Sequence, residues 1–370
     1  MIPDPDPLGL PAPVWLLTFL LLLTFVLHIL AMNFTLGGAV IAVVSDFIGR
    51  RRGDERYQRL AKDLVSFLPI TLAATITLGV APLLFVQTIY GQFFYTSSVL
   101  MAWPWLGVVP LVIVAYYGIY LYAWRGERLG DRRIWVGAGS ALLLIVVAFL
   151  YVNNVTLMLT PDRWHEIYAS HSNGLFLNGE EDTLVPRLFH FLVAAPAVAG
   201  AALMVYALFV KGRSPEGYWV WAARHGAVWF LVFTLIQAAV GPLFLFGLPS
   251  AVRDPFVGDD TLRTALLLVA IGSAVLALLA MAAALRLRNP LLPGLAGGLF
   301  LVVTVSLMSV TRHFVRDEYL SPRFSTGDLT VDSQTVLIVL FFAALLGGVA
   351  VVGYMLQAVV RASGPAQPEI

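Results

Sequence analysis

Nine separate stretches of this chain are each long and apolar enough to cross a lipid bilayer as a helix. A span needs about 20 consecutive apolar residues. Runs of this kind occupy residues 14–44, 65–90, 99–124, 134–159, 184–210, 219–246, 262–287, 291–310 and 335–360. Only 12% of the residues are charged, whereas a soluble protein has about 25%. We therefore predict an all-α, polytopic membrane protein with about nine transmembrane helices, in which residues 1–370 form a single transmembrane domain.

The composition excludes several kinds of site. The chain has no cysteine, which rules out disulfides, thiolate metal sites, iron–sulfur ligation and covalent attachment of a c-type haem. A net charge of +1 gives no reason to expect nucleic acid as a partner. The acidic, proline-rich first residues lack the basic region and the cleavage site of a signal peptide, so we expect none.

Charges in the loops predict the orientation in the membrane. Clusters of basic residues, such as Arg50–Arg51–Arg52, follow the odd-numbered spans, whereas acidic groups such as Glu180–Glu181–Asp182 lie in most of the alternate loops. Because basic loops stay on the cytoplasmic side, we predict an outside N-terminus and a cytoplasmic C-terminus. Five of the six histidines then lie in the outer half of the membrane or beyond it: His28, His165, His171, His190 and His313.

Two of these histidines, His28 and His190, lie inside apolar runs. An ionisable side chain at membrane depth is costly and therefore marks a candidate functional site. Almost no carboxylate accompanies them in the spans, which favours a metal or a haem over a proton relay. The alternative is that each imidazole packs between helices and bonds to a backbone carbonyl.

Three motifs, in order, resemble subunit I of cytochrome bd-type quinol oxidases. They are LHILAMNFTLGGA (27–39), LGVAPLLFVQTIYGQFF (78–94) and RLFHFLVAAPAVAGAAL (187–203). The resemblance covers a five-helix part, residues 14–210, and leaves a divergent four-helix part, residues 219–360. It implies that His28 is a haem ligand, that His190 binds a low-spin b haem, and that the chain lies in a bacterial or archaeal cytoplasmic membrane.

The chain departs from that family where oxygen chemistry would need acids. Gln87 stands where the family's second helix carries a glutamate, and residues 101–118 of the third span hold no acid. Thr264 and Ala265 follow Arg263 where the family places a methionine ligand, and the outer quinol-binding loop is reduced to residues 247–261. The resemblance therefore implies a bd-like haem protein that lacks the oxidase acids.

A low-spin haem requires a second axial ligand. With the family's methionine missing, our candidate is His313, just past the end of the eighth span, which would form a bis-histidine pair with His190. The alternative is a loop histidine within a basic cluster. Met308 and Met281 are weaker candidates, because methionine in a membrane helix usually packs.

Further candidate cofactor-binding residues surround these ligands. We predict that Arg187, Arg312 and Arg316 neutralise haem propionates through bidentate, charge-assisted contacts. Ordinary ion pairs with Asp317 and Glu318 are the alternative. Asn33 and Gln87 are amides inside membrane spans, and the sequence leaves open whether they bond to a haem, a quinone or a neighbouring helix.

Together these features predict a haem b-containing membrane electron-transfer subunit. It would exchange electrons between membrane quinol or quinone and an outer-side c-type cytochrome, or another periplasmic redox subunit, within a hetero-oligomeric complex in contact with membrane lipid. Such a complex would be a quinol:cytochrome c-type oxidoreductase. Two alternatives stay open: a bd-type quinol oxidase subunit that reduces oxygen, and a haem-free transporter or assembly subunit.

Overall fold

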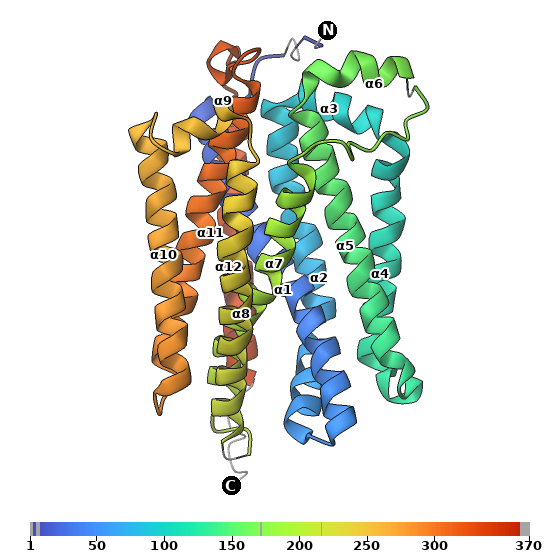
Figure 1. Ribbon diagram of the computed structural model, residues 1–370, viewed down its shortest axis with the longest axis vertical. Coiled ribbons are helices and arrows are strands. Elements are labelled where there is room, and N and C mark those ends of the chain that lie inside the picture. The colour runs from blue at the N-terminus through green and yellow to red at the C-terminus, as the bar shows by residue number, and fades with distance from the viewer. Residues whose placement is uncertain (1–2, 5–7, 171, 216, 363–370) are drawn as a thin grey trace.

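The computed structural model describes residues 3–4, 8–170, 172–215 and 217–362. Within this part of the chain, nine helices are long and apolar enough to cross a membrane, as the sequence predicts (Figure 1). They are α1 (Val14–Arg52), α2 (Glu55–Ile89), α4 (Ala102–Leu129), α5 (Arg132–Met158), α7 (Leu184–Val210), α8 (Tyr218–Phe246), α10 (Thr261–Arg286), α11 (Leu291–Leu320) and α12 (Thr335–Ala362).

Three short helices lie together at one end of this bundle, which we call the upper end (Figure 1). They are α3 (Gly91–Leu100), α6 (Trp164–Ser170) and α9 (Ser250–Arg253). The first described residues lie at the same end, whereas α12 ends at the opposite, lower end. The two ends of the described chain thus lie on opposite sides of the bundle, and the side that faces the cytoplasm stays a prediction from the loop charges.

Several helices extend beyond their apolar runs, and one extension corrects a prediction. Helix α11 continues from the predicted end at residue 310 to Leu320, so that His313 lies within the helix and not just past it. Helix α2 similarly begins at Glu55 and not at residue 65. Hydropathy marks the part of a helix that suits lipid, but charged residues such as Arg312 and Asp317 also continue a helix without difficulty.

The helices that carry the candidate ligands pack directly on one another. Helix α1 contacts α2, α7 and α11, and α7 contacts α8. At the crossing of α1 and α7, a Cβ atom at Gly37 would collide with the carbonyl oxygen of Ala195. Only glycine allows this approach, as is common where membrane helices cross. A buried cluster of α7, α8, α10 and α11 side chains also joins the two parts that the sequence distinguishes.

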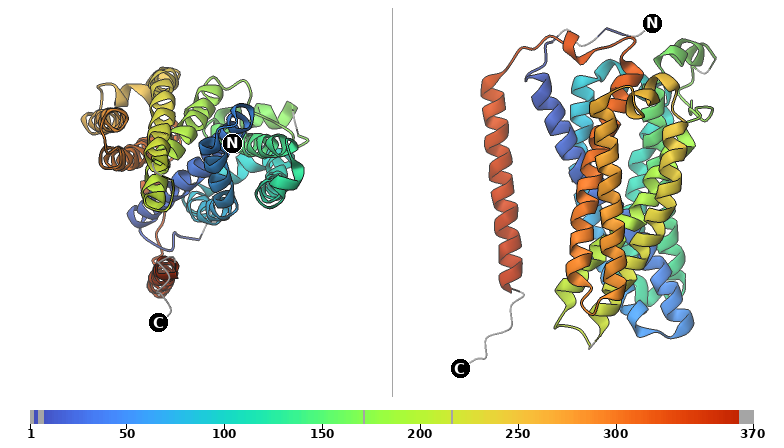
Figure 2. Two further views of the ribbon diagram at one scale, coloured as in Figure 1. Left: turned by 90° about the horizontal axis from the view of Figure 1, so that it is seen from below. Right: turned by 60° about the vertical axis from the view of Figure 1, so that its left-hand side comes forward.

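Helix α12 stands apart from the other helices (Figure 2). Its apolar window is 0% buried, and its upper end is held mainly by the backbone. The Leu10 amide donates to the Thr330 carbonyl oxygen at 2.8 Å, and the Asp332 amide donates to the Leu10 carbonyl oxygen at 2.9 Å. This isolated bridge, together with packing of Ile338 against the core, holds the upper end of α12 at the bundle.

Candidate functional site

The imidazole of His28 is held by one hydrogen bond from helix α1 to helix α2. Its Nδ1 lies 3.0 Å from the carbonyl oxygen of Thr75. Because a carbonyl oxygen only accepts, Nδ1 carries the proton and Nε2 holds a lone pair. Among the described residues Nε2 has no hydrogen-bond partner. A metal-binding histidine has this arrangement, in which the second nitrogen donates to an orienting acceptor, and so has a histidine that packs between helices and bonds to a backbone carbonyl.

A glycine on α2 makes room for this ring. A Cβ atom at Gly79 would lie 2.8 Å from Cε1 of His28 and 3.0 Å from Nδ1. Any other residue would displace the imidazole or separate the two helices. Gly79 belongs to the second of the three motifs that resemble the oxidase family, so the contact gives a physical reason for a glycine there.

His190 of α7 is held from helix α8. Its Nδ1 lies 2.7 Å from Nε2 of Gln237, and the Phe244 ring lies 5.8 Å from the imidazole, centroid to centroid. No described residue forms a hydrogen bond with Nε2 of the imidazole. His28 and His190 each use Nδ1 for a contact with a neighbouring helix, and in each the Nε2 atom has no partner among the described residues. The tautomers differ, because Nδ1 of His28 donates to a carbonyl oxygen, whereas Nδ1 of His190 accepts from the amide N–H of Gln237.

His313 is placed differently. Its Nδ1 faces Arg316 at 2.5 Å, and its Nε2 lies 3.3 Å from a carboxylate oxygen of Asp317. Both ring nitrogens thus already contact charged groups of α11, and a bis-histidine pair with His190 stays a prediction. Of the methionine alternatives, Met281 is fully buried in the core between α10 and α11, and Met308 is half-buried.

Three arginines near the upper end place their guanidinium groups over aromatic rings. Arg187 lies 4.9 Å from the ring centroid of Phe244, and Arg316 lies 4.0 Å from that of Tyr90. Both are buried, and Nε and Nη2 of Arg187 and Nε of Arg316 have no hydrogen-bond partner. Arg312 lies 4.5 Å from the Phe25 ring and forms no hydrogen bond or ion pair with a described residue. Buried donors without partners are costly, which makes these arginines candidates for contact with a ligand.

The two carboxylates closest in sequence to Arg312 and Arg316 are engaged with other groups. Asp317 accepts a hydrogen bond of 2.7 Å from the Tyr90 hydroxyl, and Glu318 pairs with Arg263 at 2.5 Å. Burial raises the pKa of Tyr90 well above its ordinary value, so the hydroxyl stays protonated and donates. Within the described chain, neither carboxylate forms a salt bridge with the three arginines.

The guanidinium groups of Arg187 and Arg316 both lie close enough to that of Arg312 to repel it. A concentration of buried positive charge without a matching carboxylate suits an anionic group such as a carboxylate of a ligand. Arg323, also close to His313 in sequence, pairs instead with Asp162.

The predicted amides lie apart from these contacts. Asn33 is 2% exposed, and its Oδ1 has no hydrogen-bond partner. Gln87, near the upper end of α2, is half-buried and forms no hydrogen bond with the described residues. His165 lies in α6 at the upper end, and His171 lies outside the described residues.

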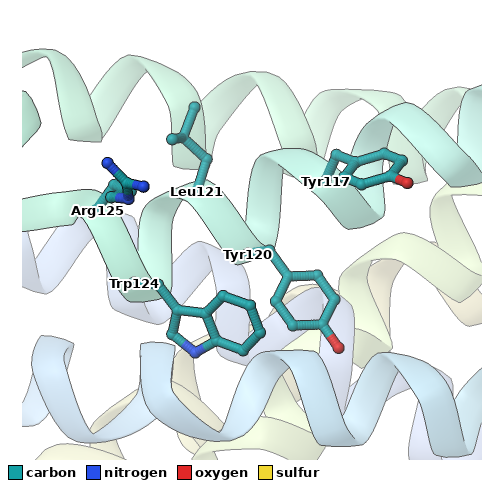
Figure 3. A pocket seen from close by; sticks show the side chains of 5 residues that line it. All are labelled: Tyr117, Tyr120, Leu121, Trp124 and Arg125. Carbon is teal, nitrogen blue, oxygen red and sulfur yellow. The ribbon is translucent and has the colours of Figure 1, made fainter.

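Two surface pockets lie away from the candidate ligands. One, of about 380 Å³, lies along α4 and is lined by Tyr117, Tyr120, Leu121, Trp124 and Arg125 (Figure 3). The other, of about 540 Å³, lies at the lower end beside Asp46.

Among the described residues no three His, Cys, Asp or Glu side chains gather in a metal-binding group. A haem iron, however, takes at most two axial protein ligands, so single imidazoles and the arginines are the donors relevant here.

Sequence reasoning missed two partners of the ligands. The Thr75 carbonyl oxygen carries no signal in the sequence, because every residue has a backbone carbonyl. Gln237 carries one, since a lone amide in the apolar run of α8 is expected to have a polar partner.

The comparisons with known proteins support the fold. No family model matches the chain, and no curated protein matches it in sequence. Among solved structures, a chain of the bd oxidase from Geobacillus thermodenitrificans superimposes with a TM-score of 0.73 at 14% identity, covering 96% of this chain and 100% of that one. The chain therefore has a bd oxidase-type membrane fold over nearly its whole length. At this identity the likeness concerns the fold alone.

Proposed function

We propose that the chain is a haem b-binding membrane subunit that transfers electrons between membrane quinol or quinone and a redox partner on the outer side, namely a c-type cytochrome or a similar periplasmic subunit. The resemblance of its motifs to bd-type oxidases supports a bacterial or archaeal cytoplasmic membrane. The absence of cysteine from this sequence requires that any c-type haem belong to another chain. A hetero-oligomeric complex follows, because electrons that enter this chain need an acceptor.

The observation that carries the proposal is the hydrogen bond from His28 to the Thr75 carbonyl oxygen. It fixes the tautomer in which Nε2 holds a lone pair. A bound haem supplies a one-electron redox centre. His28 and His190 would each hold a haem iron through Nε2, His190 once its Nδ1 carries the ring proton. The guanidinium groups of Arg187, Arg312 and Arg316, which form no ion pair with a described carboxylate, would bind the propionates. Apolar helices around them would exclude water.

The remaining candidates have more specific requirements. His313 would serve as second axial ligand only if its Nε2 left Asp317, 3.3 Å away. Asn33 offers a buried amide oxygen without a partner, and Gln87 offers an amide near the upper end of α2. We assign both to contacts with the haem or with the quinone head group, since an unpartnered amide in a membrane span requires a polar neighbour.

The test is to substitute each histidine and record the reduced-minus-oxidised spectrum of the purified chain. His28→Ala and His190→Ala should each remove a b-haem signal, and His190→Ala should remove a low-spin one. His225 is a matched control, because it is also partly buried but accepts a hydrogen bond of 2.9 Å from the Trp229 indole and stacks on Trp221. His225→Phe should leave the spectrum unchanged. An unaltered spectrum in the first two variants would reject the assignment.

The same preparation distinguishes the alternatives. A haem that responds to carbon monoxide would indicate a bd-type oxidase that reduces oxygen, with its acids supplied differently. A colourless protein, with no loss of function in His28→Ala, would indicate a haem-free transporter or assembly subunit that has kept only the fold.

A further inference from the structure

The lower half of helix α4 carries two neighbouring rows of side chains with a groove between them. Tyr117, Leu121 and Arg125 follow one another at four-residue spacing and form one row, and Tyr120 and Trp124 belong to the other. Tyr120 and Trp124 point to the side of the helix opposite Leu121 (Figure 3). These residues line the pocket of about 380 Å³, a volume within the usual range of ligand sites, roughly 300–1,000 Å³.

The aromatic row is anchored to the neighbouring helix α2. The ring of Tyr120 lies 4.3 Å from that of Trp124 and 4.7 Å from that of Tyr116, centroid to centroid. The Tyr116 hydroxyl donates to the carbonyl oxygen of Pro69 in α2, 3.3 Å away, and therefore accepts from the Tyr120 hydroxyl at 3.2 Å. One wall of the groove is thus fixed before anything binds, although Trp124 is 74% exposed.

The polarity of the groove changes along its length. Because α4 ends at the lower end of the bundle (Figure 1), Tyr117 and Leu121 lie nearer the middle of the membrane than Arg125 does. Arg125 is exposed and forms no hydrogen bond or ion pair with a described residue, and the same holds for Arg128, one turn further down. A groove that is apolar toward the membrane and cationic at its edge matches the order of an acyl chain and an anionic head group.

We propose that this groove binds one anionic phospholipid, whose phosphate contacts the guanidinium group of Arg125 and whose acyl chain lies between the two rows. Arginine forms bidentate, charge-assisted contacts with phosphate, and Arg128 adds positive charge at the same level. Charge complementarity favours this occupant over a zwitterionic lipid or an uncharged quinone. Tyr120 and Trp124 border the chain at the depth at which tyrosine and tryptophan are enriched in membrane proteins. No candidate haem ligand takes part, so the inference is independent of the proposed function.

The experiment is native mass spectrometry of the delipidated full-length protein in detergent, titrated with phosphatidylglycerol and separately with phosphatidylcholine. The wild type should bind one phosphatidylglycerol more tightly than the next, and more tightly than phosphatidylcholine. Arg125→Gln should weaken this first binding about fivefold, the contribution of one basic residue to binding of anionic lipid. Trp124→Ala removes the aromatic wall without changing the charge and should also weaken it, whereas Trp124→Phe should retain it.

Arg288→Gln is the matched control. Arg288 is exposed between α10 and α11 at the same end of the bundle, and it forms no hydrogen bond or ion pair with a described residue. Its substitution removes the same charge and should leave the first binding constant unchanged. Equal losses in the Arg125 and Arg288 variants would overturn the inference, because lipid would then respond only to overall charge. Equal binding of the two lipids, or no lipid bound to the folded wild type, would also overturn it. If Trp124→Ala does not fold, the two arginine variants decide.

Discussion

The two ends of the bundle bury charge in opposite ways. At the lower end, Asp46 is fully buried and its carboxylate is surrounded by donors: Arg133 binds it through two nitrogens, Nε of Arg50 lies 3.1 Å away and the Tyr122 hydroxyl 3.3 Å away. Near the upper end, Arg187, Arg312 and Arg316 form no ion pair with a described carboxylate. One end contains a complete charge network, and the other contains positive charge without its counterpart.

This difference separates a structural role from a binding role. The Asp46 network joins α1 to α4 and α5, and all its members belong to this chain. A buried charge that lacks a partner destabilises the fold, unless a ligand of opposite sign neutralises it. We therefore propose that the upper arginines bind an anionic group, whereas the lower network needs nothing further.

The largest expected effect comes from breaking the lower network. Asp46→Asn leaves the guanidinium of Arg133 without a counter-ion, and we expect a loss of about 3–5 kcal/mol of stability. Unfolding in detergent with increasing dodecyl sulfate measures it. The control is Asp131→Asn, which removes a partner of Arg50 that is 92% exposed and should cost less than about 1 kcal/mol. Equal effects of the two substitutions would contradict the structural role of Asp46.

Removing one charge from the three upper arginines should change the stability of the haem-free protein in the opposite direction. Arg312→Met replaces an unpaired guanidinium by an apolar side chain, so the haem-free protein should be at least as stable as the wild type. Haem binding should weaken by about 1.5–3 kcal/mol, the contribution of a hydrogen bond to a charged group. Parallel unfolding and haem-titration experiments measure both quantities. A destabilised haem-free protein would show that the arginine is structural.

A smaller effect should follow from moving a candidate ligand without changing any charge. Gly79→Ala places a Cβ atom 2.8 Å from Cε1 of His28, so the ring or helix α2 must shift. We expect a destabilisation on the order of 1 kcal/mol and a change in the spectrum of the haem bound at His28. The absence of any spectral change, with the protein folded, would contradict a haem bound at His28.

The smallest effect should come from an arginine that lies near the cluster but already has a partner. Arg323 pairs with Asp162, and both side chains are considerably exposed. Arg323→Gln should change stability by less than about 1 kcal/mol and leave haem binding unaltered. Weaker haem binding in this variant would remove the distinction between paired and unpaired arginines on which the comparison depends.

Most of the fold follows from the sequence, because a bilayer requires long apolar helices and each leaves a visible run of residues. The nine spans are confirmed, and the predicted bounds of the fifth, residues 184–210, are those of α7. The end of α11 could not be predicted from hydropathy, since its last turns carry Arg312, Arg316 and Asp317. This is why His313 was expected beyond a helix and lies inside one.

The site is less predictable than the fold. His28 and His190 could be chosen because histidine is conspicuous in an apolar run, but their orienting partners depend on how helices pack. The Thr75 carbonyl oxygen meets His28 only because α1 and α2 approach closely at Gly79. Likewise, the sequence could not show that Asp317 accepts from Tyr90 and that Glu318 pairs with Arg263. Because both carboxylates are engaged in this way, neither pairs with the three arginines.

The most direct test of the central claim is a pyridine haemochrome determination on the purified full-length chain, produced in a host with sufficient haem. We predict protohaem, at one or more per chain, with a reduced spectrum of low-spin type that carbon monoxide leaves unaltered. A folded chain that contains no haem would contradict the account, and the unpartnered arginines would then require another anion.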